Sequence, residues 1–576
     1  MPRRRTQACQ RSLSFRIVRH QISNNVVKIC VGRLWKRIRK TPLPSTTLCQ
    51  QGSFGRIGAG NLQRQVKVRV FSSLGARSRW RTEIPLVAPA DNLTMTGVDD
   101  RLLESKMIQI EQARSWSPRV ISKFEALIRD GDDLSLYRVN PLAFARDRAI
   151  TDTESIDLFL HATRCGLFEM TWDVLCPQSG MVLDSFGALR TLKTHYVCGL
   201  CDVSGETDLD DFIEVTFSVS PHLRRLPFHD PDSLSVEDFH WKLRFANDGR
   251  LPGQQARFLD YLRGLVRGLT YLPPSSSVTL RAELGPGVLS GVNVQTQAAF
   301  MTPISGEPAT APTLLRVSYD GQRFSPALAV LSPGPCIIEV ENTGPVRGSL
   351  LLINWPPEVA ALTIKPQLEF EPYISGGMLL ARQTFRRLFR SERIDEREGL
   401  GIRQVTFLFT DLKGSTALYE RLGDLNAYAL VREHFALLEL TAQQHSGAIV
   451  KTIGDAVMAV FSRPTDAVSA ALQILKEIER FNLEHGEPGI ILKIGAHCGP
   501  SIAVTLNDNL DYFGQTVNVA ARVQSLADAG EICISEALYT APGVIHLLTG
   551  HHVVEFGSSL HGVEGNASVY RIIDGP

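Results

Sequence analysis

The sequence predicts a multidomain chain whose C-terminal part is an α+β domain, preceded by a helical, zinc-ribbon-like region and a β-sandwich-like region. Three observations support this fold class. The 576 residues are too many for one hydrophobic core. Strand and helix patterns after residue 400 follow the order β-α-β-β-α-β. Between residues 271 and 375, short alternating segments are interrupted repeatedly by turn residues.

Residues 1–95 form a basic leader. Residues 1–80 contain 18 Lys and Arg but no Asp or Glu, so the other 496 residues hold 43 basic and 60 acidic residues and a net charge of −17. The leader can be interpreted as a targeting or nucleic-acid-binding arm, or as an extension that does not fold. Pro42, Pro44 and Gly52 are among the residues that interrupt any long helix, so we expect disorder.

The rest of the chain has the composition of a globular protein. Overall, 44% of the residues are hydrophobic and 21% are charged. No apolar run approaches the about 18–20 residues that a bilayer span needs, so we expect no membrane span. Ten scattered cysteines are too few for a disulfide scaffold and indicate a reducing compartment. We therefore expect a cytoplasmic protein.

Residues 96–270 combine helices with a ribbon-like segment. Val120, Phe124 and Ile128 have helical spacing, and Asp152 or Thr153 can cap a second helix. Two short helices followed by strands are typical of a winged-helix-like unit. The acidic residues within 208–214 lead into an alternating segment, which predicts an exposed strand and makes a nucleic-acid partner a poor fit.

Three cysteines in this region have the spacing of metal ligands. Cys198-Gly-Leu-Cys201 is a complete knuckle, while the first knuckle reads Cys176-Pro-Gln-Ser179. In a zinc ribbon, each knuckle presents two thiolates to one tetrahedral ion. Two interpretations remain open. Either Cys176, Cys198 and Cys201 hold Zn²⁺ with an unusual fourth ligand such as His195, or the ribbon has lost its metal and kept its fold.

Residues 271–375 have the pattern of a small β-sandwich, because Val278, Leu280 and Ala282 alternate with polar residues and Gly-Pro turns recur. Residues 376–400 are predicted to be a linker. Its run from Met378 to Arg390 reads as a basic amphipathic helix. This helix either packs on the surface of the C-terminal domain or pairs across a dimer as a transmission helix.

The chemistry is concentrated in residues 401–576. An alternating strand ends in Asp411, and Gly414 and Ser415 lead into a helix. A carboxylate at a strand tip, followed by a helix N-terminus, suits a polyphosphate with its divalent ion. A second acid, Asp455, stands in a predicted hairpin turn. Two such acids at strand tips of one sheet can hold a pair of Mg²⁺ ions.

The remaining pattern completes a ferredoxin-like βαββαβ core. A helix is predicted from Thr465 to Phe481, with Pro464 at its start. Strands are predicted from Ile490 to His497 and then through Thr505, and a helix from Gly514 to Leu526.

Three segments resemble the signatures of class III nucleotidyl cyclases. They read Phe409-Thr-Asp-Leu-Lys-Gly-Ser-Thr416, Lys451-Thr-Ile-Gly-Asp455 and Asp511-Tyr-Phe-Gly-Gln-Thr-Val-Asn518-Val-Ala-Ala-Arg522. Upstream, residues 383–390 are similar to a set of bacterial adenylate cyclases with a long N-terminal region. The resemblance implies an enzyme of intracellular signalling that converts ATP to 3′,5′-cyclic AMP and pyrophosphate.

The resemblance implies that the first set of residues holds metal and phosphate. Asp411 and Asp455, assisted by the carbonyl of Leu412, hold two Mg²⁺ or Mn²⁺ ions. The helix start at Gly414 and Ser415 faces the phosphates. His561 aligns where the family usually has a triphosphate-binding Lys, and we expect weaker ATP binding at high pH because a neutral imidazole carries no charge.

The resemblance implies that a second set contacts the nucleoside. Asn518 orients the ribose, and Arg522 stabilises charge at the α-phosphate. Lys451 and Asp511 read the base, with a hydrogen-bond polarity that fits adenine rather than guanine. In the family the two sets come from different protomers, so a homodimer with two shared sites is expected.

Two other functions fit parts of the sequence. A diguanylate cyclase has a related fold, but residues 452–457 lack its Gly-Gly-Asp/Glu-Glu-Phe hairpin. The other alternative is a catalytically weak nucleotide-sensing module coupled to an N-terminal nucleic-acid or partner-binding region. The presence of a complete set of site residues argues against that alternative.

Overall fold

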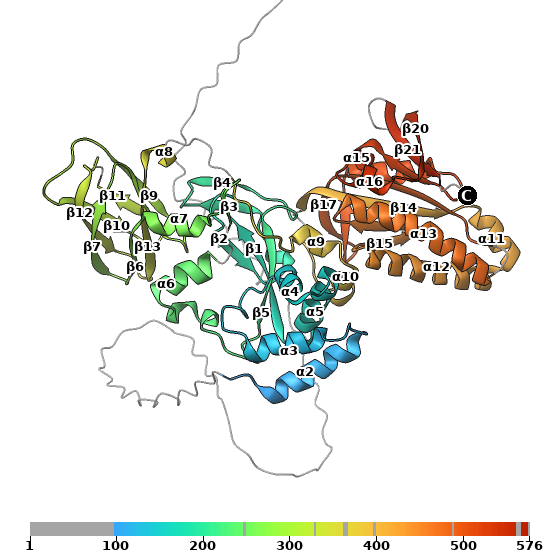
Figure 1. Cartoon of the computed structure of the whole chain (residues 1–576), viewed down its shortest axis with the longest axis horizontal. Helices are drawn as coiled ribbons and strands as arrows, with labels where there is room; N and C mark the ends of the chain where they lie inside the picture. Colours follow the sequence, from blue (N-terminus) through green and yellow to red (C-terminus); the bar gives the residue numbers. More distant parts are fainter. Residues whose placement is uncertain are drawn as a thin grey trace, which may run out of the picture. The chain divides into compact units, whose positions relative to one another are not determined.

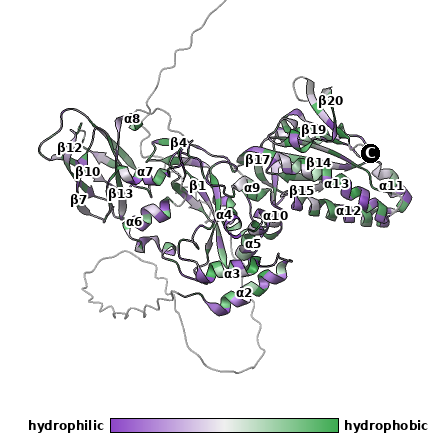
Figure 2. Cartoon of the chain, in the orientation of Figure 1, coloured by the Kyte–Doolittle hydropathy of each residue, from purple (hydrophilic) through white to green (hydrophobic). Residues whose placement is uncertain are grey.

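The computed structural model describes residues 97–245, 249–327, 330–360, 367–395, 399–485, 489–559 and 566–573 (Figure 1). The predicted leader and His561 lie outside these residues. Within the described ranges, no helix combines the length and apolar character that crossing a membrane requires. Even the long helices of the C-terminal part carry hydrophilic residues along their whole length (Figure 2).

The N-terminal part of the described chain begins with four helices rather than the two that were predicted. They are α2 (Asp100–Ala113), α3 (Val120–Asp130), α4 (Pro141–Arg148) and α5 (Asp152–Cys165). The cap of α5 is Thr151, whose hydroxyl accepts a hydrogen bond from the Glu154 N–H. Phe124, Phe144 and Phe159 pack edge to face and hold α3, α4 and α5 together.

The ribbon-like segment consists of a three-stranded sheet and a hairpin. The sheet has the order β2-β1-β5, and the hairpin pairs β3 with β4. The strands are β1 (Phe168–Leu175), β2 (Val182–Phe186), β3 (His195–Cys198), β4 (Val203–Glu206) and β5 (Ile213–Val219). The prediction of an exposed strand after the ribbon is wrong. Every residue of β5 is buried, because β5 pairs with β1 on one side and the Val215 N–H bonds the Ile374 carbonyl on the other.

Two four-stranded sheets follow, and they share one cluster of buried apolar side chains. One sheet has the order β11-β10-β12-β7, and the other has the order β6-β13-β8-β9. Their strands are β6 (Val266–Leu272), β7 (Ser276–Leu284), β8 (Gly287–Val292), β9 (Ala299–Ile304), β10 (Thr313–Tyr319), β11 (Phe324–Pro326), β12 (Gly334–Asn342) and β13 (Gly348–Trp355). Short helices flank them at α6 (Val236–Asp238), α7 (Phe258–Leu265) and α8 (Pro357–Ala360).

The predicted single helix from Met378 to Arg390 is wrong. The segment forms two short helices, α9 (Gly376–Leu380) and α10 (Gln383–Leu388), which are separated by an extended Arg382. Leu379 and Phe385 are fully buried, and the Phe385 ring packs edge to face on Trp172. The break lets both helices bury their apolar residues in the core, whereas a continuous helix would present one amphipathic face.

The C-terminal sheet has the predicted β-α-β-β-α-β order, and this part of the fold prediction is confirmed. The strands β14 (Leu400–Leu412), β15 (Ala448–Ile453), β16 (Ala456–Phe461) and β17 (Leu492–Leu506) lie in the order β15-β16-β14-β17, with antiparallel neighbours. The helices of this core are α11 (Ser415–Leu422), α12 (Asp424–Gln444) and α13 (Pro464–His485). The two strands predicted between residues 490 and 505 are one continuous strand, β17.

The sheet continues beyond this core. β17 pairs with β18 (Asn509–Phe513) and with β19 (Ile532–Ser535), and β21 (Asn566–Ile573) and β20 (His552–Ser559) extend the edge. The helices after β18 are α14 (Gln515–Ser525), α15 (Glu536–Tyr539) and α16 (Val544–Leu547).

Side-chain alternation along β14 separates two cores. Leu408 and Leu412 pack with α12 and α13, which lie side by side in Figure 1, while Phe407 and Phe409 share a cluster with Ala520 of α14.

Candidate functional site

Two carboxylates meet at one edge of the C-terminal sheet. Asp411 lies near the end of β14, and Asp455 lies in the turn between β15 and β16. The antiparallel register pairs Thr410 with Val457, which brings the end of β14 beside that turn. Gly454 has φ +66, a conformation that glycine adopts without strain and that forms the tight turn.

The surroundings of Asp411 shift its pKa upwards. Burial raises the pKa of Asp411, and the negative charge of Asp455 raises it further, while Lys493 opposes the shift. A hard divalent cation prefers oxygen ligands, and its charge offsets the repulsion between two nearby carboxylates. The pair therefore fits Mg²⁺ or Mn²⁺, and the Leu412 carbonyl follows directly in the chain.

Two residues near Asp411 were not predicted from the sequence. Lys493 of β17 stands directly opposite Asp411 in the antiparallel pair, and the Gln524 side chain of α14 lies near the Asp411 carboxylate. Only the long-range pairing register of the sheet indicates their place beside Asp411, and a local sequence pattern does not contain this information. Lys493 places a positive charge beside the carboxylate pair.

The turn after Asp411 leads into α11. Gly414 has φ +73 and lies at the N-terminus of this helix, immediately before Ser415. No side chain of the described residues caps the helix start. The first backbone N–H groups of α11 can therefore bind an anion, as was predicted for the helix start at Gly414 and Ser415.

Lys451 and Asp511 form an ion pair, in which the Lys451 Nζ lies 2.6 Å from the Asp511 Oδ2. Asp511 is only 8% exposed, and its Oδ1 accepts a hydrogen bond of 2.8 Å from the Tyr512 N–H. A buried acceptor thus lies next to an ammonium donor. This pair can recognise a ligand edge that offers a hydrogen-bond acceptor beside a donor.

Asn518 and Arg522 lie four residues apart on α14 and therefore share one face of the helix. Asn518 is exposed and Arg522 is half-buried, while Val519 and Val523 face the core. Among the described residues, neither side chain has a hydrogen-bond or ion-pair partner. No such interaction within the described ranges joins them, or the Lys451–Asp511 pair, to the carboxylates of Asp411 and Asp455.

The helix α10 contacts both strands that carry the Lys451–Asp511 pair. The Gln383 Oε1 accepts a hydrogen bond of 2.8 Å from the Ile449 N–H of β15. The Arg386 guanidinium donates to the Leu510 carbonyl of β18 and lies over the Tyr512 ring. Gln383, Arg386 and Leu510 also line a cavity of about 300 Å³ between α10 and these strands.

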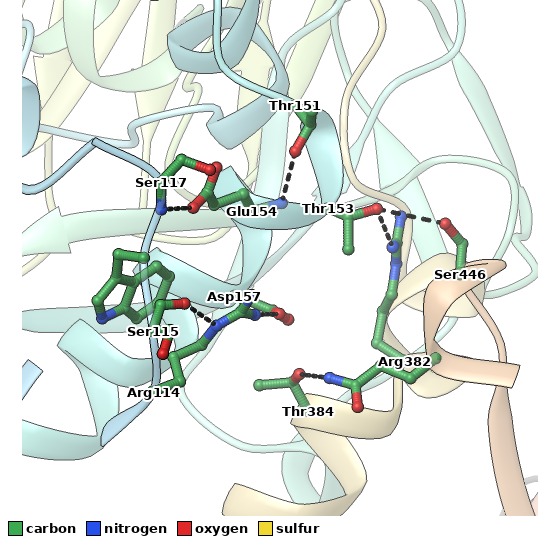
Figure 3. A network of polar contacts seen from close by, with 12 residues as sticks. Arg114, Ser115, Ser117, Thr151, Thr153, Glu154, Asp157, Arg382, Thr384 and Ser446 are labelled. Atoms are coloured by element: carbon green, nitrogen blue, oxygen red, sulfur yellow. Dashed lines mark hydrogen bonds and ion pairs between the residues drawn. The ribbon is translucent and has the colours of Figure 1, made fainter. Parts of the chain in front are cut away.

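A polar network connects α5 to the turn before β15 (Figure 3). The Thr153 hydroxyl accepts a hydrogen bond of 3.2 Å from Arg382 and lies 3.4 Å from the Ser446 Oγ. Asp157 of the same helix forms an ion pair with Arg114, and the Glu154 carboxylate accepts from the Ser117 N–H. The start of β15 is thus held from outside the C-terminal sheet.

The three predicted cysteine ligands lie together, with sulfur atoms within 4.8 Å of one another. His195, the alternative ligand, is exposed on β3 and does not belong to this group. The structure therefore assembles Cys176, Cys198 and Cys201 without His195.

Comparison with known proteins divides the chain into two parts. Residues 400–550 match a family model described as the adenylate and guanylate cyclase catalytic domain. Residues 104–387 match a model described as a family of unknown function.

Individual relatives match only part of this chain. Guanylate cyclase 32E of Drosophila melanogaster is 30% identical over 153 residues, which are 24% of this chain and 13% of that protein. An adenylate cyclase of Anabaena cylindrica is 31% identical over 137 residues, 22% of this chain and 27% of that protein. This chain thus spans well under a third of the length of either relative. The crystal structure of the adenylyl cyclase CyaB from P. aeruginosa matches at 22% identity and a TM-score of 0.28, covering 31% of this chain and 97% of that chain.

Proposed function

Because residues 400–550 belong to the adenylate and guanylate cyclase catalytic-domain family, we propose that this chain is an adenylate cyclase that converts ATP to 3′,5′-cyclic AMP and pyrophosphate. The observation that carries the choice of ATP is the 2.6 Å contact between Lys451 and Asp511. Adenine offers a ring nitrogen acceptor beside an amine donor, which complements an ammonium beside a carboxylate. Guanine offers the opposite polarity on the same edge.

The reaction joins the ribose 3′-oxygen to the α-phosphorus, releases the hydroxyl proton and breaks the bond to the pyrophosphate oxygen. Asp411 and Asp455 would hold two Mg²⁺ or Mn²⁺ ions. When bound, these ions supply positive charge that acidifies the hydroxyl and neutralises the triphosphate. Lys493 adds a fixed positive charge beside Asp411.

Two residues of α14 act on the nucleotide in this proposal. The Asn518 amide positions the ribose so that its 3′-oxygen lies in line with the leaving group. The Arg522 guanidinium stabilises the charge that develops at the α-phosphate. Neither side chain has a hydrogen-bond or ion-pair partner among the described residues, so both can contact the nucleotide.

The complete site requires two copies of the chain. In this proposal the carboxylates of one protomer meet the Lys451–Asp511 pair and the α14 residues of the other. This arrangement accounts for the lack of any hydrogen bond or ion pair between the two sets within the described part of one chain. A two-fold symmetric homodimer then contains two equivalent sites.

The N-terminal region controls this site through α10. Gln383 and Arg386 fix the strands that carry the base-reading pair. Thr153 of α5 accepts a hydrogen bond from Arg382 and contacts Ser446 before β15. A change in the helical region is therefore transmitted directly to the adenine-binding strands. The activating signal acts on residues 97–388 in this proposal.

Turnover of ATP by the purified full chain tests the proposal. With Mn²⁺ and ATP, the wild type should form cyclic AMP, and Asp411→Ala and Asp455→Ala should each lose that activity by several orders of magnitude. Glu484→Ala, an exposed acid near the end of α13, is the matched control and should retain it. Activity that survives both aspartate substitutions would contradict the proposed site.

A further inference from the structure

The two knuckles of the ribbon bring four side chains to one buried point. Cys176 and Ser179 lie in the loop between β1 and β2, and Cys198 and Cys201 border the turn between β3 and β4. All four residues are at most 5% exposed. None of the elements of the proposed cyclase site contributes to this cluster.

Two distances in the cluster match those of tetrahedral coordination. The Cys176 and Cys201 sulfur atoms are 3.8 Å apart, and the Ser179 Oγ is 3.8 Å from the Cys198 sulfur. A tetrahedral ion with bonds of ~2.3 Å to sulfur separates its ligand atoms by about 3.8 Å. A disulfide would instead require ~2.05 Å between two sulfur atoms, so the cysteines are not bonded to each other.

The knuckle backbones support the same geometry. The loop of the first knuckle is closed by the hydrogen bond from the Gly180 N–H to the Cys176 carbonyl. A closed turn of this kind presents the ligands of one knuckle to a single ion in a zinc ribbon.

We propose that Cys176, Cys198 and Cys201 bind one soft divalent ion of the zinc class, with the Ser179 hydroxyl directed at the fourth position. Three converging buried sulfur atoms provide the ligands that such an ion prefers over Mg²⁺ or Ca²⁺. The ion ties the β1–β2 loop to the β3–β4 hairpin. This site is separate from the proposed catalytic ions and does not depend on the proposed function.

The ion also stabilises a contact with the catalytic strand. Directly after β4, the Asp210 carboxylate accepts hydrogen bonds of 2.8 and 2.9 Å from the Arg403 and Gln404 N–H groups of β14. The Leu209 N–H bonds the Gly401 carbonyl at 2.8 Å. Loss of the ion should therefore loosen the start of β14 as well as the ribbon.

Metal analysis of the full chain tests this proposal. Protein purified under reducing conditions should contain one Zn²⁺ per chain, and Co²⁺ substitution should give the spectrum of a tetrahedral site with three thiolates. A Zn²⁺-free chain that also fails to bind Co²⁺ while its thiols are reduced would overturn the proposal. So would a Cys176–Cys201 disulfide detected in the mass of the unreduced protein.

Three variants make the assignment specific. Ser179→Cys completes the first knuckle, so its Co²⁺ form should gain thiolate-to-metal charge-transfer intensity and its Zn²⁺ affinity should rise at least tenfold. An unchanged cobalt spectrum in this variant would place Ser179 away from the ion and contradict the proposal. Cys198→Ser should lose the ion, while Cys336→Ser, which changes a buried cysteine of β12, should keep it. Equal loss of the ion in Cys198→Ser and Cys336→Ser would also contradict the proposal.

Discussion

The Lys451 ammonium and the Asp511 carboxylate lie 2.6 Å apart, although 60 residues separate them in the sequence. They are carried by β15 and β18, which are not neighbours in the sheet. The carboxylate is almost buried, while the lysine side chain is 40% exposed. The donor can therefore turn toward a ligand while the acceptor stays fixed.

This relationship predicts how nucleotide selectivity changes. In Lys451→Glu combined with Asp511→Cys, the polarity of the pair is reversed, and preference should shift from ATP toward GTP. Each unpaired buried group costs about 1–3 kcal/mol, so the ratio of kcat/KM for ATP and GTP should change by at least about tenfold. The measurement is steady-state kinetics with both nucleotides. Arg480→Glu, which removes an exposed ion pair of α13, is the control and should leave the ratio unchanged.

Complementation between two inactive variants tests the shared site. Asp411→Ala removes a metal ligand, and Arg522→Ala removes a group from the other half of the site. When the two proteins are mixed, half of the dimers are heterodimers with one intact site, so about a quarter of the wild-type activity should return. Mixing Asp411→Ala with Asp455→Ala should restore none, because both changes affect the same half. Equal recovery in both mixtures would contradict the shared arrangement.

The contact of α10 with β18 predicts a distal effect on ATP binding. Arg386→Ala removes the hydrogen bond to the Leu510 carbonyl, which precedes Asp511. Loss of one such bond costs about 1 kcal/mol, so KM for ATP should rise several-fold. Arg387→Ala, at the exposed neighbouring position, should leave KM unchanged. If both variants have the same KM for ATP and the same melting temperature, the result contradicts the proposed coupling.

Burial of His497 predicts a pH dependence of stability. Burial lowers the pKa of this imidazole from 6.5 to about 4, and its Nδ1 hydrogen-bonds the Ser535 hydroxyl at 2.7 Å. As pH falls, His497 is therefore protonated in the unfolded chain before it is protonated in the folded chain. The contribution of the neutral His497 imidazole to the free energy of unfolding is fully present above pH 6.5. It decreases toward pH 4 by on the order of 2–3 kcal/mol.

Chemical denaturation of wild type and His497→Gln between pH 4 and pH 7 checks this expectation. The glutamine removes the titrating group and keeps a polar partner for Ser535, so the variant should lose less stability on acidification. His546→Gln changes an exposed histidine and should follow the wild type. Parallel curves for all three proteins would show that His497 does not contribute.

Local chemistry made the positions of the two carboxylates predictable from the sequence. Asp411 follows an alternating strand, and Gly454 and Asp455 form a tight turn that only a few residue types allow. The cysteine spacing likewise predicted a cluster, because knuckle geometry is determined within four residues. That Ser179 rather than His195 lies beside the cysteines needed the structure, since both lie near the knuckles in sequence.

Features that depend on distant partners were predicted less well. The amphipathic pattern after Met378 favoured one helix, but burial of Phe385 against Trp172 outweighs the periodicity and divides the segment. β5 was expected to be exposed because its acidic flank is polar, yet Ile374 covers its second edge. Lys493 was missed because only strand register places it opposite Asp411.

The most direct test of the central claim is product analysis after turnover of an equimolar mixture of ATP and GTP. The purified full chain is incubated with both nucleotides and Mn²⁺, and the cyclic products are quantified by mass spectrometry beside Asp411→Ala. The account predicts predominantly 3′,5′-cyclic AMP with matching pyrophosphate from the wild type and neither cyclic product from the variant. Predominant cyclic GMP would contradict the assignment of Lys451 and Asp511 to adenine, and no cyclic nucleotide from the wild type would contradict the proposed enzyme.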